Sequence, residues 1–202
     1  MEETDLYKTI EGPSEGLYKE KGSRFIALAY PVKNEDEIRD IVVGLKEKYY
    51  DARHHCYAWR LGLDKDRFRA NDDGEPSSTA GKPILGQLLS NDLTDILIVV
   101  IRYFGGIKLG VSGLINAYRV AAADAIDHAV IVEKTVDEQL RIKFDYLVMN
   151  DVMKIVKDMS PDVLERNFEM DCEMLLSIRQ NDMPALRERL EKVESLIFPD
   201  EK

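Results

Sequence analysis

An unbroken apolar run stands out near the middle of the chain. Residues 96–101 are all aliphatic, which is typical of a strand covered on both faces. Behind this run, apolar residues from Leu114 to Ala129 recur at the spacing of one helical face, and Ser112 stands where the N-cap of that helix is expected. The pattern therefore predicts a buried strand, a glycine-rich turn and a long helix.

The segments before this run alternate between strand and helix patterns. Residues 1–21 are polar and predict only a loose or strand-like lead-in. The further elements expected up to residue 89 are strands over 23–32, 54–61 and 67–70, a helix capped by Asn34 and reaching Tyr49, a loop at 71–83, and a short helix starting near Pro83. The first part of the chain is therefore expected to form one domain of mixed strands and helices.

A second series of elements begins at about residue 135. It consists of a strand over 138–144, a helix over 148–159, strands over 163–170 and 172–179, a helix capped by Asn181 or Asp182, and a short strand over 195–198. The order β-α-β-β-α-β is the ferredoxin-like pattern. We therefore predict an α+β protein with two domains, residues 1–134 and 135–202, joined near residues 133–137.

The charge of the chain is acidic overall and basic in one place. The net charge is −10, which argues against broad nonspecific coating of DNA. No Asp or Glu lies between Asp95 and Asp124, whereas Arg102, Lys108 and Arg119 do. A local basic site is sufficient for a nucleic acid, so the charge pattern directs attention to this window.

Targeting and cysteine patterns exclude several classes of protein. No apolar run approaches the length of a membrane span, and the start of the chain lacks a signal pattern, so we expect a soluble, cytoplasmic protein with no membrane partner. Cys56 and Cys172 lie far apart without a C-x-x-C pair, so neither a disulfide framework nor a thiolate zinc site is indicated.

The first candidate for chemistry is the polar loop at 72–83. It holds three carboxylates, three hydroxyls, two glycines and a lysine in twelve residues. A phosphate-binding P-loop needs four residues between its glycines and a Ser or Thr after its lysine, whereas here six residues intervene and Pro83 follows Lys82. What remains is a polar loop that either lines a pocket or forms an ordinary surface turn.

The second candidate is the pair His54 and His55. Adjacent residues of a strand point to opposite faces, so the two histidines cannot ligate one metal without distortion. His54 and Cys56 share a face, but zinc needs three or four ligands, so we predict no metal. His55 is expected to contact a phosphate or a carboxylate, or else to be half-buried. A nucleophile and base, with Cys56 or a hydroxyl of residues 77–79 beside a histidine, stays open, although no G-x-S-x-G elbow is present.

The third candidate is the glycine-rich stretch 102–108, with Trp59 on a strand expected nearby. Aromatic residues interleaved with Arg and Lys suit base stacking beside phosphate contacts. The glycines, followed by the N-terminus of the long helix, can present backbone amides to an anion. The alternative is that Tyr103 and Phe104 pack against the helix while the glycines form a tight turn.

Through these blocks the chain resembles the YigZ/IMPACT family (UPF0029 domain), in the form of a bacterial two-domain member. The blocks that carry the resemblance are residues 53–58, 71–76, 79–84, 100–110 and 113–119. The resemblance implies a ribosomal protein S5 domain 2-like α/β sandwich, followed by a small ferredoxin-like domain similar to one of elongation factor G. It also implies a connection to translation, because the eukaryotic relatives dampen a starvation-activated kinase of the translation machinery, and it implies no established catalytic activity.

We therefore predict a non-enzymatic RNA- or ribosome-binding modulator of translation without a cofactor, a metal or a catalytic residue. Two alternatives stay open: an enzyme acting on a nucleotide or phosphorylated small molecule, with the carboxylates of residues 72, 73 and 75 as Mg²⁺ ligands or bases, and an adaptor that binds translation-related proteins. The residues expected to bind the ligand are Arg53, His54, His55, Asp73, Gly74, Glu75, Ser78, Thr79, Gly81, Lys82, Arg102, Tyr103, Phe104, Gly105, Gly106, Lys108, Gly110, Gly113, Tyr118 and Arg119.

Overall fold

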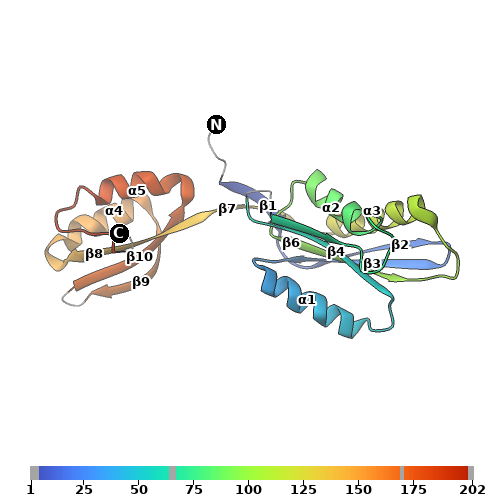
Figure 1. Cartoon of the computed structure of the whole chain (residues 1–202). Helices are drawn as coiled ribbons and strands as arrows, with labels where there is room; N and C mark the ends of the chain where they lie inside the picture. Colours follow the sequence, from blue (N-terminus) through green and yellow to red (C-terminus); the bar gives the residue numbers. More distant parts are fainter. Residues whose placement is uncertain (1–4, 64–66, 169–170, 200–202) are drawn as a thin grey trace. The chain divides into compact units, whose positions relative to one another are not determined.

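The computed structural model describes residues 5–63, 67–168 and 171–199. The chain divides into two units, of which the larger is Tyr7–Lys134 and the smaller joins Met1–Leu6 to Thr135–Lys202. Both units combine strands with helices (Figure 1), so the chain is an α+β protein. No helix in the described ranges is long and apolar enough to cross a membrane.

The larger unit is built on an antiparallel sheet of five strands. The strand order across the sheet is β2 (Ser14–Glu20), β3 (Ser23–Pro31), β6 (Ile96–Tyr103), β4 (His54–Leu61) and β5 (Arg67–Asn71). The aliphatic run at 96–101 lies in the central strand β6, and each of its residues is fully buried. The predicted strand at 96–101 is therefore confirmed, and it is covered on both faces because it is the central strand of the sheet.

Helices cover both faces of this sheet. Helix α1 (Glu35–Lys48) lies on one face, and α2 (Gly81–Ser90) and α3 (Gly110–Asp127) lie on the other (Figure 1). Along β6 the side chains alternate between the two cores: Ile98 and Val100 pack with α2 and α3, whereas Val99 and Ile101 pack with α1. Both parities of the strand are apolar for this reason.

The two main helices of this unit begin differently. The side chain of Asn34 accepts a hydrogen bond from the Glu37 amide at 2.9 Å, as expected of an N-cap. The prediction that Ser112 caps α3 is wrong, because that helix begins at Gly110 and has no side-chain cap. Gly110 has a φ of +75°, a left-handed conformation that a glycine adopts easily, so the chain enters the helix two residues before Ser112.

Three strands of the larger unit's periphery have weak sequence patterns. Strand β1 (Leu6–Ile10) pairs with β7 (Ile131–Thr135), and β2 forms an edge of the main sheet. Ser14, Gly16 and Tyr18 of β2 face α3, and the strand comes closest at Gly16, whose added Cβ would meet the Ala125 amide nitrogen at 2.3 Å. A strand that approaches its helix through a glycine shows no apolar alternation, which explains why the lead-in was not resolved into strands.

The smaller unit contains an antiparallel sheet of three strands and two helices. The strand order across the sheet is β8 (Asp137–Asp145), β10 (Asp171–Arg179) and β9 (Asp162–Phe168). In the chain, α4 (Met149–Met159) connects β8 to β9, and α5 (Met183–Leu190) follows β10. Ile197 forms an isolated antiparallel bridge with Lys143 beside β8. Residues 169 and 170, at the end of the predicted strand 163–170, lie outside the described residues.

An ion pair ties the N-terminal segment into the smaller unit. The Arg179 guanidinium donates two hydrogen bonds to the Asp5 carboxylate, from Nε at 2.6 Å and from Nη2 at 2.7 Å. The Asp5 side chain is 1% exposed, and the pairing with Arg179 holds its pKa below the ordinary value. The smaller unit therefore contains residues from both ends of the chain.

Candidate functional site

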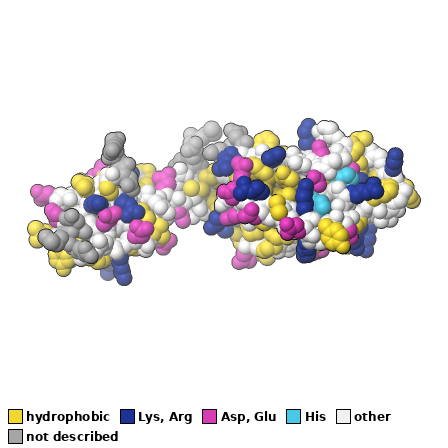
Figure 2. Space-filling model, turned by 60° about the horizontal axis from the view of Figure 1, so that its bottom comes forward, with side chains coloured by type: hydrophobic (Ala, Val, Ile, Leu, Met, Phe, Trp, Pro, Cys, Tyr) yellow, Lys and Arg dark blue, Asp and Glu magenta, His cyan; other side chains and the backbone are white. Residues whose placement is uncertain are grey.

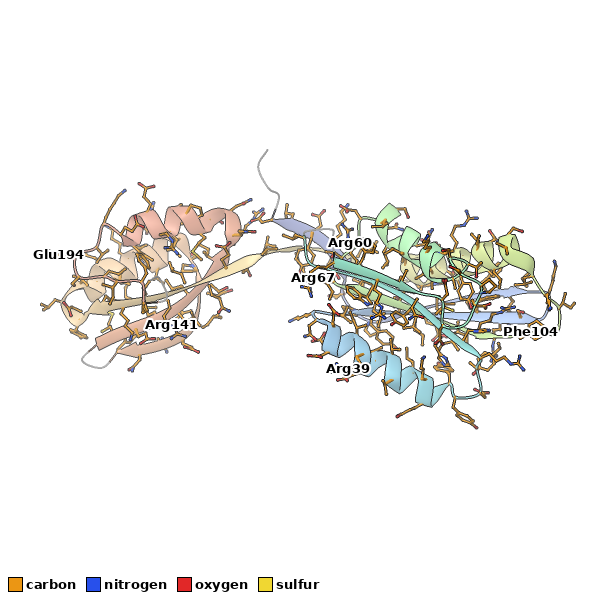
Figure 3. All side chains as sticks on the ribbon, viewed as in Figure 1. Arg39, Arg60, Arg67, Phe104, Arg141 and Glu194 are labelled. Atoms are coloured by element: carbon orange, nitrogen blue, oxygen red, sulfur yellow. The ribbon has the colours of Figure 1, made fainter. Side chains whose placement is uncertain are left out.

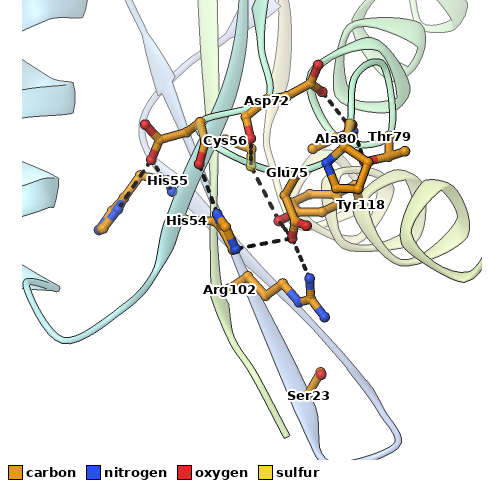
Figure 4. Close-up of polar contacts among 12 residues, drawn as sticks. Ser23, His54, His55, Cys56, Asp72, Glu75, Thr79, Ala80, Arg102 and Tyr118 are labelled. Atoms are coloured by element: carbon orange, nitrogen blue, oxygen red, sulfur yellow. Dashed lines mark hydrogen bonds and ion pairs between the residues drawn. The ribbon is translucent and has the colours of Figure 1, made fainter. Parts of the chain in front are cut away.

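A buried carboxylate lies at the centre of the predicted site. Oε1 of Glu75 accepts hydrogen bonds from Nη1 of Arg102 at 2.5 Å and from the Tyr118 hydroxyl at 2.8 Å, and Nε2 of His54 lies 4.0 Å away (Figure 4). The Glu75 side chain is only 3% exposed. A carboxylate buried to this degree requires a paired cation and hydrogen-bond donors, and Arg102 and Tyr118 supply them.

The loop that carries Glu75 is anchored by Asp72. The Asp72 carboxylate accepts hydrogen bonds from three backbone amides, those of Ser78 at 2.7 Å, Ala80 at 3.0 Å and Gly81 at 2.8 Å. Burial acts to raise the pKa of Asp72, but these amide donors outweigh it and hold the pKa below the ordinary value. Asp72 therefore closes the loop onto the first turn of α2 and fixes the position of Glu75.

We expect replacement of Asp72 by alanine to destabilise the protein by about 1–3 kcal/mol at pH 7, because three amides lose their acceptor. The pKa of Asp72 is lower in the folded state than in the unfolded state, where it is near 3.8. The ionised carboxylate therefore stabilises the fold fully above about pH 3.8, and this stabilisation is lost as the pH falls through the folded-state pKa. Urea unfolding from about pH 7 down to about pH 3 should therefore show the deficit of Asp72→Ala shrinking in acid.

The neutral cap of α1 offers a matched control for this prediction. Replacing Asn34 with alanine removes one amide acceptor and no charge, so its cost of about 1 kcal/mol should not depend on pH in the same way. An Asp72→Ala deficit that stays constant in acid would mean that the carboxylate charge does not stabilise the loop.

The neighbouring Asp73 connects the loop to the two histidines. Its carboxylate accepts hydrogen bonds from Nζ of Lys46 at 2.9 Å and from the His55 amide at 2.8 Å, while its backbone carbonyl lies 2.9 Å from Nδ1 of His54. His55 is buried with Nε2 3.1 Å from the Tyr49 carbonyl, and burial lowers its pKa. His54 thus faces the Glu75 cluster, whereas His55 faces the other side of the sheet.

Beneath Glu75, Cys56 and Tyr118 form a closed hydrogen-bonded pair. The Cys56 thiol lies 3.3 Å from the Tyr118 hydroxyl and 3.0 Å from the Asp72 carbonyl, and neither side chain is exposed to solvent. Burial raises the pKa of the Cys56 thiol and that of the Tyr118 hydroxyl far above their ordinary values. A buried, protonated thiol is a poor nucleophile, so the geometry gives no support to Cys56 as a catalytic residue.

A pocket of about 440 Å³ opens above Glu75. We call it the helix pocket, because α3 begins at its wall. It is lined by Arg53, His54, Glu75, Pro76, Arg102, Phe104, Lys108, Leu109, Gly110, Val111 and Leu114. Within the described parts of the chain, Arg53 and Lys108 form no ion pair, and the first amides of α3 have no side-chain acceptor. The helix pocket therefore combines unneutralised cations with an uncapped helix N-terminus, which favours an anion.

Arg102 is a buried cation in the wall of the helix pocket. Its side chain is 7% exposed, with the guanidinium carbon 5.4 Å from the Phe25 ring centroid and 5.6 Å from that of Phe104. Nη1 is used by Glu75, but the buried Nε has no hydrogen-bond partner among the described residues. The buried Nε of Arg60, outside the helix pocket, is likewise unpartnered among the described residues, so Arg102 contributes to the helix pocket through its charge and its pairing with Glu75.

The structure brings together only part of the predicted set. Of the residues predicted to bind the ligand, those that line the helix pocket are Arg53, His54, Glu75, Arg102, Phe104, Lys108 and Gly110. Those that support its walls through hydrogen bonds or close contacts are His55, Asp73, Gly74, Ser78, Thr79, Gly81 and Tyr118. The remaining ones, outside its lining, are Lys82, Tyr103, Gly105, Gly106, Gly113 and Arg119.

The structure corrects the predicted role of Trp59 and adds an apolar wall to the site. Trp59 is 6% exposed and packs in the α1 core, because its parity on β4 faces that helix, so it is not available to stack on a base. Phe104, by contrast, is 47% exposed at the end of β6 (Figure 3). The apolar wall made by Pro76, Leu109 and Leu114 was missed, although the helical spacing from Gly110 to Leu114 places those two residues on the same side of α3.

The carboxylates of the loop do not converge on a cation. Asp72 faces the amides of α2 and Asp73 faces Lys46, so only Glu75 faces the helix pocket. In the described ranges no group of three or more His, Cys, Asp or Glu side chains is arranged to hold a metal ion.

Fold and pocket together define a class: an α+β protein whose larger unit carries a basic pocket at the end of a helix-covered antiparallel sheet. Residues 21–126 match the model of the Impact N-terminal domain. The IMPACT family member YvyE of Bacillus subtilis is 31% identical over 182 residues, which cover 90% of this chain and 84% of that protein. The chain belongs to the IMPACT family.

Two solved structures are similar to the chain to different degrees. A crystal structure of a hypothetical protein has a TM-score of 0.74 at 26% identity and covers 95% of each chain. A structure of the two-domain translational regulator Yih1 covers 59% of this chain and 48% of that one at 24% identity, with a TM-score of 0.39. The first similarity extends over both units, whereas the second is too low to transfer a function.

Proposed function

We propose that the chain is a non-enzymatic modulator of translation that binds RNA, free or in the ribosome, through a phosphate group held in the helix pocket. The observation that supports this most directly is that Arg53 and Lys108, which form no ion pair among the described residues, line the helix pocket together with the uncapped start of α3. A phosphate would accept from these two side chains and from the helix amides at once.

The charges of the helix pocket suit a phosphate. Arg102 is already paired with Glu75, so the excess positive charge comes from Arg53, Lys108 and the end of the helix dipole. These groups lie on a chain of net charge −10, where nonspecific attraction to a polyanion is weak. A local contact to phosphate is therefore the interaction that the charge distribution favours.

The apolar side of the helix pocket suits a base or a ribose. Phe104 is exposed next to the cationic residues, and Leu109 and Leu114 lie at the start of α3. Stacking of a base on an aromatic side chain stabilises binding by about 1–3 kcal/mol, regardless of sequence. Figure 2 shows Lys and Arg side chains, together with Asp and Glu, around the histidines of the larger unit.

Binding explains these groups better than chemistry does. The Cys56 thiol and Tyr118 hydroxyl are buried with raised pKa values, and the Glu75 carboxylate is neutralised by Arg102. None of the three is placed as an activated nucleophile. The link to translation rests on the family resemblance.

The fold families of the two units are also part of the proposal. We infer an S5 domain 2-like sandwich for residues 1–134 and a ferredoxin-like domain, similar to one of elongation factor G, for residues 135–202. In support of the latter, the order β8-β10-β9, with Ile197 bridging to β8 on its outer side, is the order that a β-α-β-β-α-β chain adopts in a ferredoxin-like sheet.

An Arg53→Ala/Lys108→Ala double variant tests the RNA proposal. The unsubstituted protein should bind a fluorescent oligouridylate, and log K should fall linearly with log salt. We expect the double variant to bind at least about tenfold more weakly at low salt, with a smaller salt slope, because both cations that neutralise the phosphate in the helix pocket are removed. Fluorescence anisotropy at several salt concentrations gives both quantities.

The matched control is Lys82→Ala/Arg119→Ala, which removes the same charge from exposed residues outside the helix pocket. It should bind nearly as well as the unsubstituted protein. Equal weakening by both double variants would show that net charge, and not the helix pocket, governs binding. Absence of RNA binding at low salt would contradict the proposed function.

A further inference from the structure

A second pocket, of about 450 Å³, lies at the turn between β2 and β3. We call it the hairpin pocket. It is lined by Lys19, Glu20, Lys21, Gly22, Ser23, Arg24 and Tyr103. Lys21 and Gly22 have φ values of +47° and +79°, as in the two-residue turns that fit the twist of a β-hairpin. The first central position of such a turn usually holds Asn, Asp or Gly, and here it holds an exposed lysine.

The hairpin pocket carries cations that the rest of the molecule does not neutralise. Within the described ranges, Lys19, Lys21 and Arg24 form no ion pair, although the chain holds 38 acidic residues. The one carboxylate in the lining, Glu20, accepts a hydrogen bond from the Tyr18 hydroxyl at 3.2 Å. Three cations without an ion-pair partner among the described residues, beside a single carboxylate, give the hairpin pocket a positive potential, which favours an anionic ligand.

An aromatic ring lies beside these cations. The guanidinium carbon of Arg24 lies 4.7 Å from the Tyr103 ring centroid, and the Tyr103 hydroxyl donates to Asp51 at 2.8 Å. The ring is thus held in place at one wall of the hairpin pocket. A fixed aromatic side chain next to free cations is the combination that proteins use to hold single-stranded nucleic acids.

The two pockets lie on either side of one backbone segment. Tyr103 lines the hairpin pocket, whereas its neighbours Arg102 and Phe104 line the helix pocket, because side chains alternate along β6. After the strand, Gly105 packs directly on the hairpin: its amide donates to Oγ of Ser23 at 3.1 Å, and an added Cβ would overlap the Gly22 backbone. Adjacent Cα atoms are about 3.8 Å apart, so the two pockets are close neighbours.

We propose that the hairpin pocket is a second phosphate subsite, and that a single RNA strand crosses Gly105 with one phosphate in each pocket. The proposal rests on the proposed function and deepens it, because it makes the partner single-stranded. Lys21 and Arg24 neutralise the second phosphate, while Phe104 offers an exposed ring at the crossing. Two small concave sites separated by a backbone ridge fit a flexible strand, whereas duplex RNA is read by shape across its minor groove.

The experiment compares Lys21→Ala/Arg24→Ala with Arg53→Ala/Lys108→Ala in the full chain, using an oligouridylate of about ten nucleotides. A single strand loses about 0.7 from its salt slope for each phosphate contact removed. Each double variant removes the cations around one phosphate and should therefore lower the slope by about 0.7, and the Lys82→Ala/Arg119→Ala control should leave it unchanged. Thermal unfolding of each variant shows whether the fold is retained.

A second measurement separates the two pockets. Uridine monophosphate is small enough to fill the helix pocket alone, so its affinity should fall in Arg53→Ala/Lys108→Ala and stay the same in Lys21→Ala/Arg24→Ala. The longer oligonucleotide should weaken in both variants.

Distinct outcomes would overturn the two proposals separately. An oligonucleotide slope unchanged in Lys21→Ala/Arg24→Ala, with a reduced slope in Arg53→Ala/Lys108→Ala, removes the second subsite and leaves the helix pocket standing. Binding of duplex RNA as tight as that of the single strand, or of polyglutamate as tight as that of RNA, also removes the single-strand assignment. No RNA binding by the unsubstituted chain ends both proposals.

Discussion

Replacement of Arg102 by methionine is expected to destabilise the protein by about 3–5 kcal/mol at neutral pH. The substitution keeps much of the side-chain volume between the rings of Phe25 and Phe104, but it leaves the Glu75 carboxylate, 3% exposed, without its cation. Denaturant unfolding followed by circular dichroism measures the loss. The expected size depends on burial, since an unpaired charge in water costs little.

Two companion variants make this result specific. Arg39 forms an ion pair with Asp36 in which both side chains are more than half exposed, so Arg39→Met should change stability by less than about 1 kcal/mol. The double variant Arg102→Met/Glu75→Gln removes both charges and should recover part of the loss. If Arg102→Met costs no more than Arg39→Met, the Glu75 cluster does not depend on its ion pair.

Replacement of Gly105 by alanine is expected to destabilise the protein by about 3 kcal/mol, at the upper end of the range for overpacking. An added Cβ would lie 1.9 Å from the carbonyl carbon of Gly22 and 2.2 Å from the amide nitrogen of Ser23. These are backbone atoms on a paired hairpin, so they cannot rotate away as a flexible side chain would. The hairpin must separate from the loop that follows β6.

Gly12 provides the matched control, since an added Cβ there meets no atom within 4 Å. Gly12→Ala should change the free energy of unfolding by no more than about 0.5 kcal/mol. Denaturant unfolding compares the two variants. Equal stability of Gly105→Ala and the unsubstituted protein would mean that the hairpin is not packed against the loop.

Much of the main sheet could be predicted because the pattern of its strands is strong. The aliphatic run of β6 is apolar at both parities because α1 covers one face and α2 and α3 cover the other. The predicted helix start at Ser112 failed because Gly110, with its positive φ, already turns the chain into α3. Strand β2 could not be seen, since it meets its helix through Gly16.

The candidate site was predicted by residue type better than by position. Arg119 was grouped with Arg102 and Lys108 because the three are close in sequence. It lies nine residues, or about two and a half helical turns, after Gly110, so its side chain is far from the helix pocket and on the opposite side of α3. Lys82 is likewise outside the helix pocket. Tyr103 and Phe104 were treated as one aromatic pair, but strand alternation sends them to different pockets. The role of Glu75 depends on contacts with Arg102 and Tyr118 that no local pattern records.

The pairing of Asp5 with Arg179 has a consequence for the order in which the chain folds during synthesis. The two residues are 174 positions apart, so Asp5 leaves the ribosome long before the arginine with which it pairs. The larger unit, Tyr7–Lys134, is complete well before then and is effectively an insertion within the smaller one. A nascent chain arrested before residue 179 should therefore hold a folded larger unit beside an N-terminal segment that is still open to proteases.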